Sequence, residues 1–216
     1  MASPSKKPIR RSIREEQKRF TRERLLDAAI EIFEQVGFRE ATIDQITLAA
    51  GANRTTFYLH FSDKLDLARE LATRTMALCS SLYTELGKMY DPSLAEVHNW
   101  LERMFLLRQQ HKVLFDVAHE ASINDSAVKH LQMQFHRARI HEYFQPLFRH
   151  HLPEVKDILV TRIMLLNLMY DRYFFLDEFK RNNALSVKPI LNEVANMWLS
   201  GVLSKTPANI KLEDKN

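Results

Sequence analysis

Glycine, proline and cysteine are all scarce in this chain of 216 residues, which holds four glycines, seven prolines and one cysteine. Because glycine and proline punctuate turns and interrupt helices, their scarcity predicts few tight turns and a mostly helical fold. The single cysteine, Cys79, excludes an intramolecular disulfide framework and fits a reducing compartment. Met76, Leu78 and Leu82 surround it at helical spacing, so we expect a small buried residue rather than a reactive thiol.

Long hydrophobic runs are also missing. Within the most apolar segment, 155–179, the longest run without a charged residue is the eight residues 163–170, whereas a membrane-spanning helix needs about 20 apolar residues. The basic N-terminus is not followed by the apolar stretch of a signal peptide. We therefore expect a cytoplasmic protein that does not bind membranes.

Positive charge is concentrated at the N-terminus. Residues 1–24 contain nine Lys or Arg and three Glu, a net charge of +6, whereas the whole chain carries +4 and residues 25–216 therefore carry −2. A basic segment ahead of a nearly neutral body favours a polyanion as partner, although a solvated disordered tail fits the charge alone equally well. Residues 1–17 also lack apolar periodicity, so we predict a flexible basic arm there.

A buried helical stripe follows the arm. Apolar residues recur at i, i+4, i+7, i+8 and i+11 from Leu25, which is typical of one face of an α-helix. Gly37 is the expected end of this helix, with Phe38 folding back over its last turn. The predicted members of the stripe are Leu25, Ala29, Ile32, Phe33 and Val36.

Two short helices joined by a glycine turn are predicted next. Thr42 and Gln45 have the spacing of a capping box, which begins a helix of about eight residues that ends at Gly51. Asn53 is a strong N-cap for a second short helix over about 53–60. Two short helices separated by such a turn are typical of a helix-turn-helix.

The second short helix carries many hydrogen-bond donors. Phe57 and Phe61 form an inward-facing i, i+4 pair, which leaves the polar side chains to face outward. The N-terminal residues of such a helix can enter the major groove of DNA. An arginine there, such as Arg54, can bind guanine O6 and N7 bidentately.

Phosphate contacts are expected around the same helix. The free N–H groups at the helix start beside Thr42 form an anion site. Lys64 is a cation near the start of the next helix, an unfavourable place that a bound phosphate would explain. An ordinary surface of a small helical subdomain is the alternative for any one of these residues. The predicted DNA contacts are Thr42, Arg54, Thr55, Thr56, Tyr58, His60 and Lys64.

The chain resembles the DNA-binding region of TetR-type transcriptional regulators over residues 21–72, TRERLLDAAIEIFEQVGFREATIDQITLAAGANRTTFYLHFSDKLDLARELA. The shared features are Gly-Phe at 37–38, the threonine at 42, Ala-Gly at 50–51 and TFYLHFSDK at 56–64. The resemblance covers about a quarter of the chain. It implies an all-helical homodimer that binds a palindromic operator in double-stranded DNA.

Carried over residue by residue, the resemblance implies base contacts from Arg54, Thr55 and Thr56, with Tyr58 as a further possibility. It implies phosphate contacts from Thr42, Tyr58, His60 and Lys64. Many relatives have a small residue where this chain has Thr55, so its fit to the groove and its sequence preference can differ.

The predicted fold class is all-α, with two domains. Residues 18–64 form a three-helix domain with the helix-turn-helix, and residues 65–203 form a larger helical domain. The resemblance implies that this larger domain binds an effector and dimerises. Ser62 is the expected cap of the long helix that joins the two, and residues 204–216 are expected to be a disordered tail.

The last two predicted helices, 154–180 and 187–203, are apolar around more than one face. Such helices are buried on two sides, which favours a dimer interface, and the resemblance implies a four-helix bundle with their mates. Ala195, Ser200 and Gly201 would allow a partner helix to approach closely. A helix that is unusually buried within a monomer is the alternative.

An effector pocket is expected between helices of the larger domain. Eight of the nine histidines lie there, and Asp116 and His119 share a helix face. No pair of Glu-x-x-His helices completes a di-iron set, however, so we expect neither a metal nor a cofactor. The candidate pocket residues are Trp100, Met104, Phe115, His119, Met133, His136 and Tyr170.

These patterns and the resemblance together predict a ligand-responsive transcriptional regulator, most simply a repressor that an unidentified small molecule releases from its operator. A DNA-binding protein or adaptor that uses the same motif without an effector is the alternative. An enzyme is disfavoured, because the sequence shows no nucleophile–base pair, phosphate-binding loop or metal set.

Overall fold

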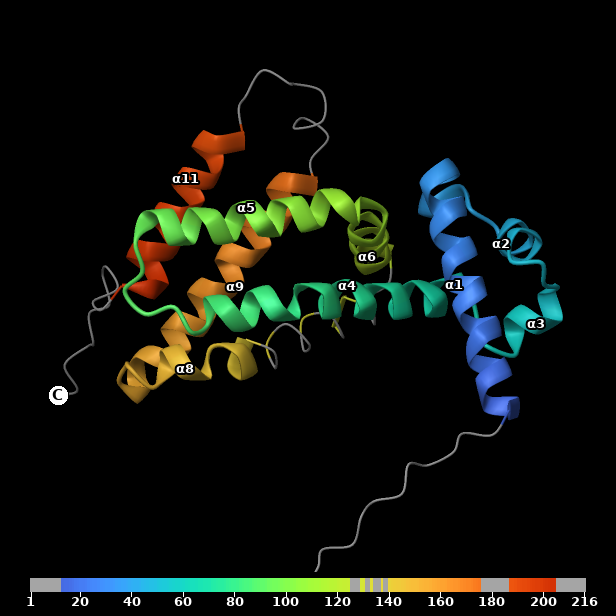
Figure 1. Cartoon of the computed structure of the whole chain (residues 1–216), viewed down its shortest axis with the longest axis horizontal. Helices are drawn as coiled ribbons and strands as arrows, with labels where there is room; N and C mark the ends of the chain where they lie inside the picture. The colour runs from blue at the N-terminus through green and yellow to red at the C-terminus, as the bar shows by residue number, and fades with distance from the viewer. Residues whose placement is uncertain are drawn as a thin grey trace, which may run out of the picture. The chain divides into compact units, whose positions relative to one another are not determined.

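The computed structural model of the chain describes residues 13–124, 129–130, 133, 137, 140–175 and 187–204. Every regular element in these ranges is a helix, so the predicted all-α fold is confirmed (Figure 1). The chain divides into two compact units, residues 1–71 and 72–216. The described elements are α1 (Ile13–Glu40), α2 (Ile43–Ala49), α3 (Arg54–Tyr58), α4 (Lys64–Leu86), α5 (Leu94–Gln110), α6 (Lys112–Asn124), α8 (Gln145–Phe148), α9 (Pro153–Phe175), α11 (Val187–Trp198) and the π-helix η1 (Leu199–Leu203).

Helix α1 is interrupted near its end by Gly37. The φ of 81° and ψ of 161° at this residue are accessible to glycine and strongly disfavoured for other residues. The interruption returns Phe38 onto the helix, where its ring meets that of Phe33 edge to face at 5.3 Å, as predicted. Leu25 is fully buried, but Val36 is 41% exposed, because the helical face ends at the next residue.

The first unit extends beyond its predicted limits at both ends. Helix α1 begins at Ile13, so the predicted arm, 1–17, is helical over residues 13–17. The unit also reaches Leu71 rather than residue 64, because the start of α4 belongs to it and contributes the fully buried Leu67.

The core of the second unit is built around two tryptophans. Trp100 of α5 and Trp198 of α11 are 2% and 1% exposed, and their ring centroids lie 6.1 Å apart. Phe144 stacks on Trp198 at 6.2 Å. The burial of these large rings is a major source of stability, and it holds α5 and α11 side by side (Figure 1).

Gly87 lets another segment approach the end of α4. A Cβ atom at this position would lie 2.1 Å from the carbonyl oxygen of Tyr143. The Gly87 carbonyl in turn accepts a hydrogen bond of 3.1 Å from the N–H of Leu147. Only a residue without a side chain fits between these two backbones.

The last two helices lie close to their predicted limits. Helix α9 covers residues 153–175, and α11 with η1 covers 187–203. The remainder of the predicted helix 154–180 and nearly all of the predicted tail fall outside the described residues. None of the described helices combines the length and the hydropathy that a membrane crossing requires.

Candidate nucleic-acid interface and ligand cavity

The predicted capping box at the start of α2 is confirmed. The backbone N–H of Gln45 donates to Thr42 Oγ1 at 3.2 Å, and the backbone N–H of Thr42 donates to Gln45 Oε1 at 2.8 Å. Thr42 remains exposed. Since a helix N-terminus carries partial positive charge and free N–H groups, this end of α2 is suited to an anion.

Helix α3 is held by a side-chain cap and by one buried ring. The predicted cap, Asn53, accepts hydrogen bonds from the backbone N–H of Thr56 at 2.8 Å and from its hydroxyl at 3.0 Å. Phe57 is fully buried and Phe61 is 1% exposed, so the inward pair is confirmed. The hydroxyl of Thr56 is thus already a donor within the protein, which leaves its lone pairs and methyl group for other contacts.

The opposite side of α3 is open to solvent. Arg54 and Thr55 are exposed, and Tyr58 and Leu59 are 52% and 69% exposed. The Nε of Arg54 lies 3.2 Å from Asp44 Oδ1 on α2, and both side chains are about two-thirds exposed. The two helices therefore present one face with donors at the start of each.

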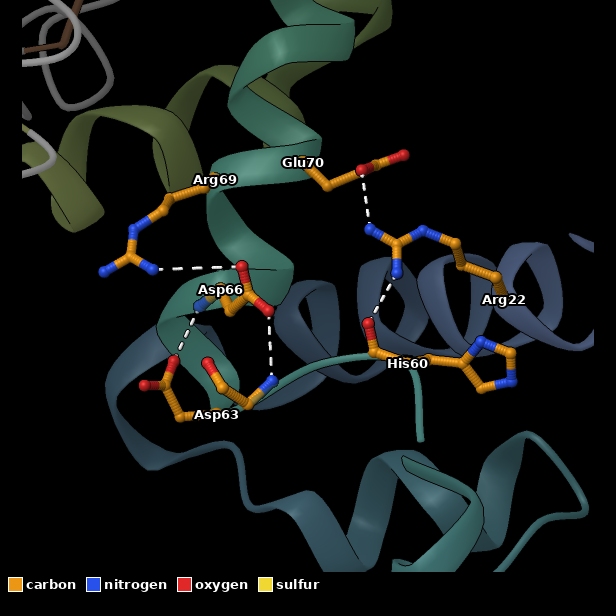
Figure 2. A network of polar contacts seen from close by, with 7 residues as sticks. Arg22, His60, Asp63, Asp66, Arg69 and Glu70 are labelled. Carbon is orange, nitrogen blue, oxygen red and sulfur yellow. Dashed lines mark hydrogen bonds and ion pairs between the residues drawn. The ribbon is translucent and has the colours of Figure 1, made fainter. Parts of the chain in front are cut away.

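Arg22 of α1 ties α3 to the start of α4 (Figure 2). Its Nη1 donates to the carbonyl of His60 at 2.6 Å, and its Nη2 donates to Glu70 Oε2 at 2.9 Å. The guanidinium also lies 4.1 Å from the centre of the Phe61 ring. This part-buried network fixes the end of α3 relative to the two longer helices within the first unit.

The start of α4 is capped by Asp63 rather than by the predicted Ser62. The N–H of Asp66 donates to Asp63 Oδ1 at 2.6 Å, and Asp66 Oδ2 accepts from the backbone N–H of Ser62 at 3.0 Å (Figure 2). A carboxylate at this end of a helix also complements the helix dipole, which favours aspartate over serine.

His60 is half-buried in the first unit. Burial lowers the pKa of its imidazole, and the charges of Arg22 and Lys18 lower it further, so the ring is neutral at pH 7. Its Nδ1 is buried and has no hydrogen-bond partner among the described residues. A neutral imidazole is a weaker phosphate ligand than a charged one, so the phosphate contact by His60 stays a prediction.

Lys64 has a structural role that the sequence analysis did not predict. Its Nζ lies 2.6 Å, 3.0 Å and 2.6 Å from the carbonyl oxygens of Phe38, Arg39 and Ala41. These carbonyls, at the end of α1 and just beyond it, compensate the cation, so its position near a helix N-terminus no longer calls for a phosphate. The DNA contact by Lys64 stays a prediction without that support.

The second unit contains a cavity of about 530 Å³, within the range of small-molecule sites. Five of the predicted pocket residues line it: Met104, Phe115, His119, Met133 and Tyr170.

Two predicted pocket residues are not among those lining the cavity. His136 lies outside the described residues. Trp100 belongs to the core instead, where its Nε1 donates to the carbonyl of Leu82 at 2.6 Å and its ring packs against Trp198.

The cavity wall also holds polar residues that the sequence analysis missed. Tyr83 donates its hydroxyl to Asn167 Oδ1 at 3.0 Å, and Arg108 Nη1 lies 3.1 Å from Asp171 Oδ1. Arg108 is 8% exposed and lies 5.0 Å from the centre of the Phe115 ring. A usable signal was its place on α5, because an arginine four residues after Met104 continues the buried face of an amphipathic helix.

Burial in the cavity wall favours the neutral forms of a cysteine, a tyrosine and a histidine. Burial raises the pKa of the Cys79 thiol to about 12 and raises that of the Tyr83 hydroxyl well above its usual value. Burial also lowers the pKa of His119, with further contributions from Arg172 and Arg108. Among the described residues, no three His, Cys, Asp or Glu side chains are grouped to hold a metal ion.

Residues 25–71 match the family model of bacterial regulatory proteins of the tetR family. The HTH-type transcriptional regulator SrpR of Pseudomonas putida is 27% identical over 135 residues, which cover 60% of this chain and 60% of that protein. The HTH-type transcriptional repressor BepR of Brucella suis biovar 1 (strain 1330) is 39% identical over 54 residues, 25% of this chain and 26% of that protein. The chain thus spans less than two thirds of the length of these curated relatives.

The fold is similar to the crystal structure of a protein assigned to the TetR family, from Mesorhizobium loti, with a TM-score of 0.59. The sequences are 17% identical, and the similarity covers 83% of this chain and 93% of the other. The family model covers the helix-turn-helix, where the exposed face of α3 and the capped start of α2 lie. Residues 25–71 thus carry a DNA-binding region of the tetR type, as the resemblance in sequence implied.

Proposed function

We propose that this regulator is a repressor that binds a palindromic operator as a homodimer and leaves it when a small molecule occupies the cavity of the second unit. The observation that carries the DNA-binding part is the exposed N-terminal half of α3 beside the capped start of α2. The name of the Brucella suis relative, a repressor, supports repression rather than activation.

Base contacts are proposed for the first residues of α3. Arg54 and Thr55 are exposed, and Thr56 can offer its methyl group or an acceptor lone pair. Phosphate contacts are proposed for Thr42 at the start of α2 and for Tyr58, which is 52% exposed. His60 and Lys64 complete the proposed set with the weaker support described above.

The homodimer is proposed to form through α9 and α11. Four large apolar side chains lie exposed on one face of α9: Leu165, Leu168, Met169 and Tyr173 are 61%, 47%, 38% and 37% exposed. On α11, Met197 is 45% exposed. Clustered exposed apolar side chains are typical of an interaction surface, and a twofold pairing is the commonest arrangement.

The small residues of the last helix support this interface only in part. Ala195 is fully buried within its own unit, so it cannot admit a partner helix as predicted. Ser200 is exposed, and a Cβ atom on Gly201 would meet nothing within 4 Å.

Helix α4 is the proposed link between effector and DNA. Its first residues, 64–71, belong to the first unit, and Thr75, Cys79 and Tyr83 further along line the cavity. A ligand shifts the dimer between two states only if it binds them with different affinity. The DNA-bound state is expected to hold the two α3 helices about 34–36 Å apart.

Selection from genomic DNA tests the proposal. The purified protein is mixed with sheared genomic fragments at moderate salt, because low salt strengthens non-specific backbone binding, and the bound fragments are sequenced. An inverted repeat shared by the recovered fragments supports the proposal. Fragments with no common sequence would contradict it.

Arg54→Ala then tests the named face. We expect its affinity for the recovered operator to fall about ten- to hundredfold, since one bidentate guanine contact is worth about 1–3 kcal/mol. Its affinity for unrelated DNA should change much less. Arg149→Ala, which removes an exposed arginine of the second unit, is the matched control and should bind the operator as the unchanged protein does.

A further inference from the structure

The charged side chains that line the cavity are mostly cationic. Three lining residues, Arg108, Lys129 and Arg172, are positive, and Asp171 is the one carboxylate among the described lining residues. His119 adds no negative charge: burial is the main cause that lowers its pKa, Arg172 and Arg108 lower it further, and Asp116 raises it.

The carboxylate is already engaged by a buried cation. Asp171 Oδ1 lies 3.1 Å from Arg108 Nη1, and the side chain of Arg108 is 9% exposed whereas that of Asp171 is 43% exposed. A cationic ligand would have to compete with Arg108 for this carboxylate. Separating the pair would leave a guanidinium enclosed without its partner, which is strongly unfavourable.

The rest of the wall suits an apolar body. Methionine and aromatic side chains contribute a large part of it, including Met76, Met104, Phe115 and Phe144. Phe144 is fully buried and Met104 is 4% exposed. Lys129 is exposed and so is Arg172, so cationic groups lie where the cavity is accessible from solvent.

We infer that the cavity binds an amphipathic anion, a carboxylate or sulfonate on an apolar body. Lys129 and Arg172 recognise the head group, and the methionine and aromatic wall contacts the body. The ligand class does not depend on the proposed function. Only the further statement that this ligand is the effector rests on it.

Isothermal titration calorimetry with the full-length protein tests the sign of the ligand charge. Two series are used, each with one apolar body and three head groups: decanoate, decanol and decyltrimethylammonium, then naphthoate, naphthalenemethanol and naphthalenemethylammonium. In at least one series we expect the acid to bind about tenfold more tightly than the alcohol and the ammonium, the equivalent of one charge-assisted hydrogen bond.

Two variants locate the head group. Lys129→Gln and Arg172→Gln should each weaken binding of the acid about three- to tenfold while leaving the alcohol unchanged, because each removes one charge and retains a polar side chain. Lys88→Gln and Arg149→Gln remove exposed charges that do not line the cavity and should have no effect.

The inference is overturned if the alcohol or the ammonium binds as tightly as the acid in both series, or if no acid binds. It is also overturned if the two variants weaken acid and alcohol equally, since that would indicate damage to the cavity rather than loss of a head-group contact. Release of DNA is measured separately. An acid that binds but does not release the operator supports the ligand class and contradicts its role as effector.

Discussion

A single surface contact, between Arg54 and Asp44, bears on how α3 meets DNA. Both side chains are about two-thirds exposed, with Arg54 Nε 3.2 Å from Asp44 Oδ1. Contacts this exposed contribute about 0–1 kcal/mol, so the Arg54 side chain can leave Asp44 to bind a base. In the absence of DNA, the contact holds this side chain near α2. Asp44 also places a negative charge in the first turn of α2, close to where phosphates are proposed to bind.

Asp44→Asn is expected to weaken discrimination between DNA sequences. Removing the carboxylate should raise affinity for unrelated DNA about three- to tenfold, because one like charge near the phosphates is lost, and should raise operator affinity less. Fluorescence anisotropy at several salt concentrations measures the ratio of the affinity for the operator to the affinity for unrelated DNA. Asp27→Asn, at an exposed acid of α1, serves as the control. An unchanged ratio in Asp44→Asn would refute the role assigned to this carboxylate.

Lys64 offers a second residue-scale test, because its structural and DNA-binding roles predict different losses. Lys64→Ala removes three contacts to carbonyl oxygens, so we expect the free energy of unfolding to fall by about 1–3 kcal/mol in urea titrations. Lys88→Ala, at an exposed lysine, should unfold as the unchanged protein does. Equal stability of the two variants would argue against the structural role.

The DNA-binding role of Lys64 has its own measurement. If its ammonium also contacts a phosphate, the slope of log affinity against log salt should fall by about one in Lys64→Ala. We expect this fall if the proposed phosphate contact forms in addition to the three carbonyl contacts of the ammonium group. An unchanged slope would limit Lys64 to its structural role.

At the scale of elements, a glycine can be replaced by alanine only where no neighbouring backbone lies against the added Cβ atom. Gly87→Ala would bring a Cβ atom 2.1 Å from the Tyr143 carbonyl oxygen and 2.7 Å from its carbon. Because both neighbours are backbone, the second unit must rearrange, and we expect a loss of about 1–3 kcal/mol in chemical denaturation. Gly201→Ala is the matched control, since nothing lies within 4 Å of its added carbon. Comparable stability in both variants would show that α4 ends differently in solution.

Helices whose ends are set by residues a few positions apart in the sequence could be predicted. The surroundings of a buried residue, which depend on packing between distant segments, could not. The Thr42 box and the Asn53 cap depend on residues three positions away, so the sequence alone located α2 and α3. Trp100 and Arg108 are both buried on α5, yet one faces the core and the other the cavity. Only the helices packed against α5 distinguish those two places, and residue type misleads because a tryptophan suits either.

At the scale of the whole molecule, the exposed apolar face of α9 predicts the oligomeric state. Leu165→Glu should convert a dimer to a monomer, because a carboxylate buried in an apolar interface without a partner is costly. Size-exclusion chromatography with light scattering gives the mass directly. Leu106→Glu changes a leucine of α5 that is 58% exposed, so it controls for the substitution itself. If the Leu165→Glu variant remains a dimer, the interface lies on another surface.

The buried thiol of Cys79 has a practical consequence. Burial raises its pKa to about 12, so very little thiolate, the reactive form, is present at neutral pH. Maleimide dyes should therefore not react with Cys79 in the folded protein, so Cys79 does not have to be replaced before labelling. A cysteine introduced at Leu59, which is 69% exposed, would then carry one fluorophore on the proposed DNA face and report the arrival and departure of DNA in real time.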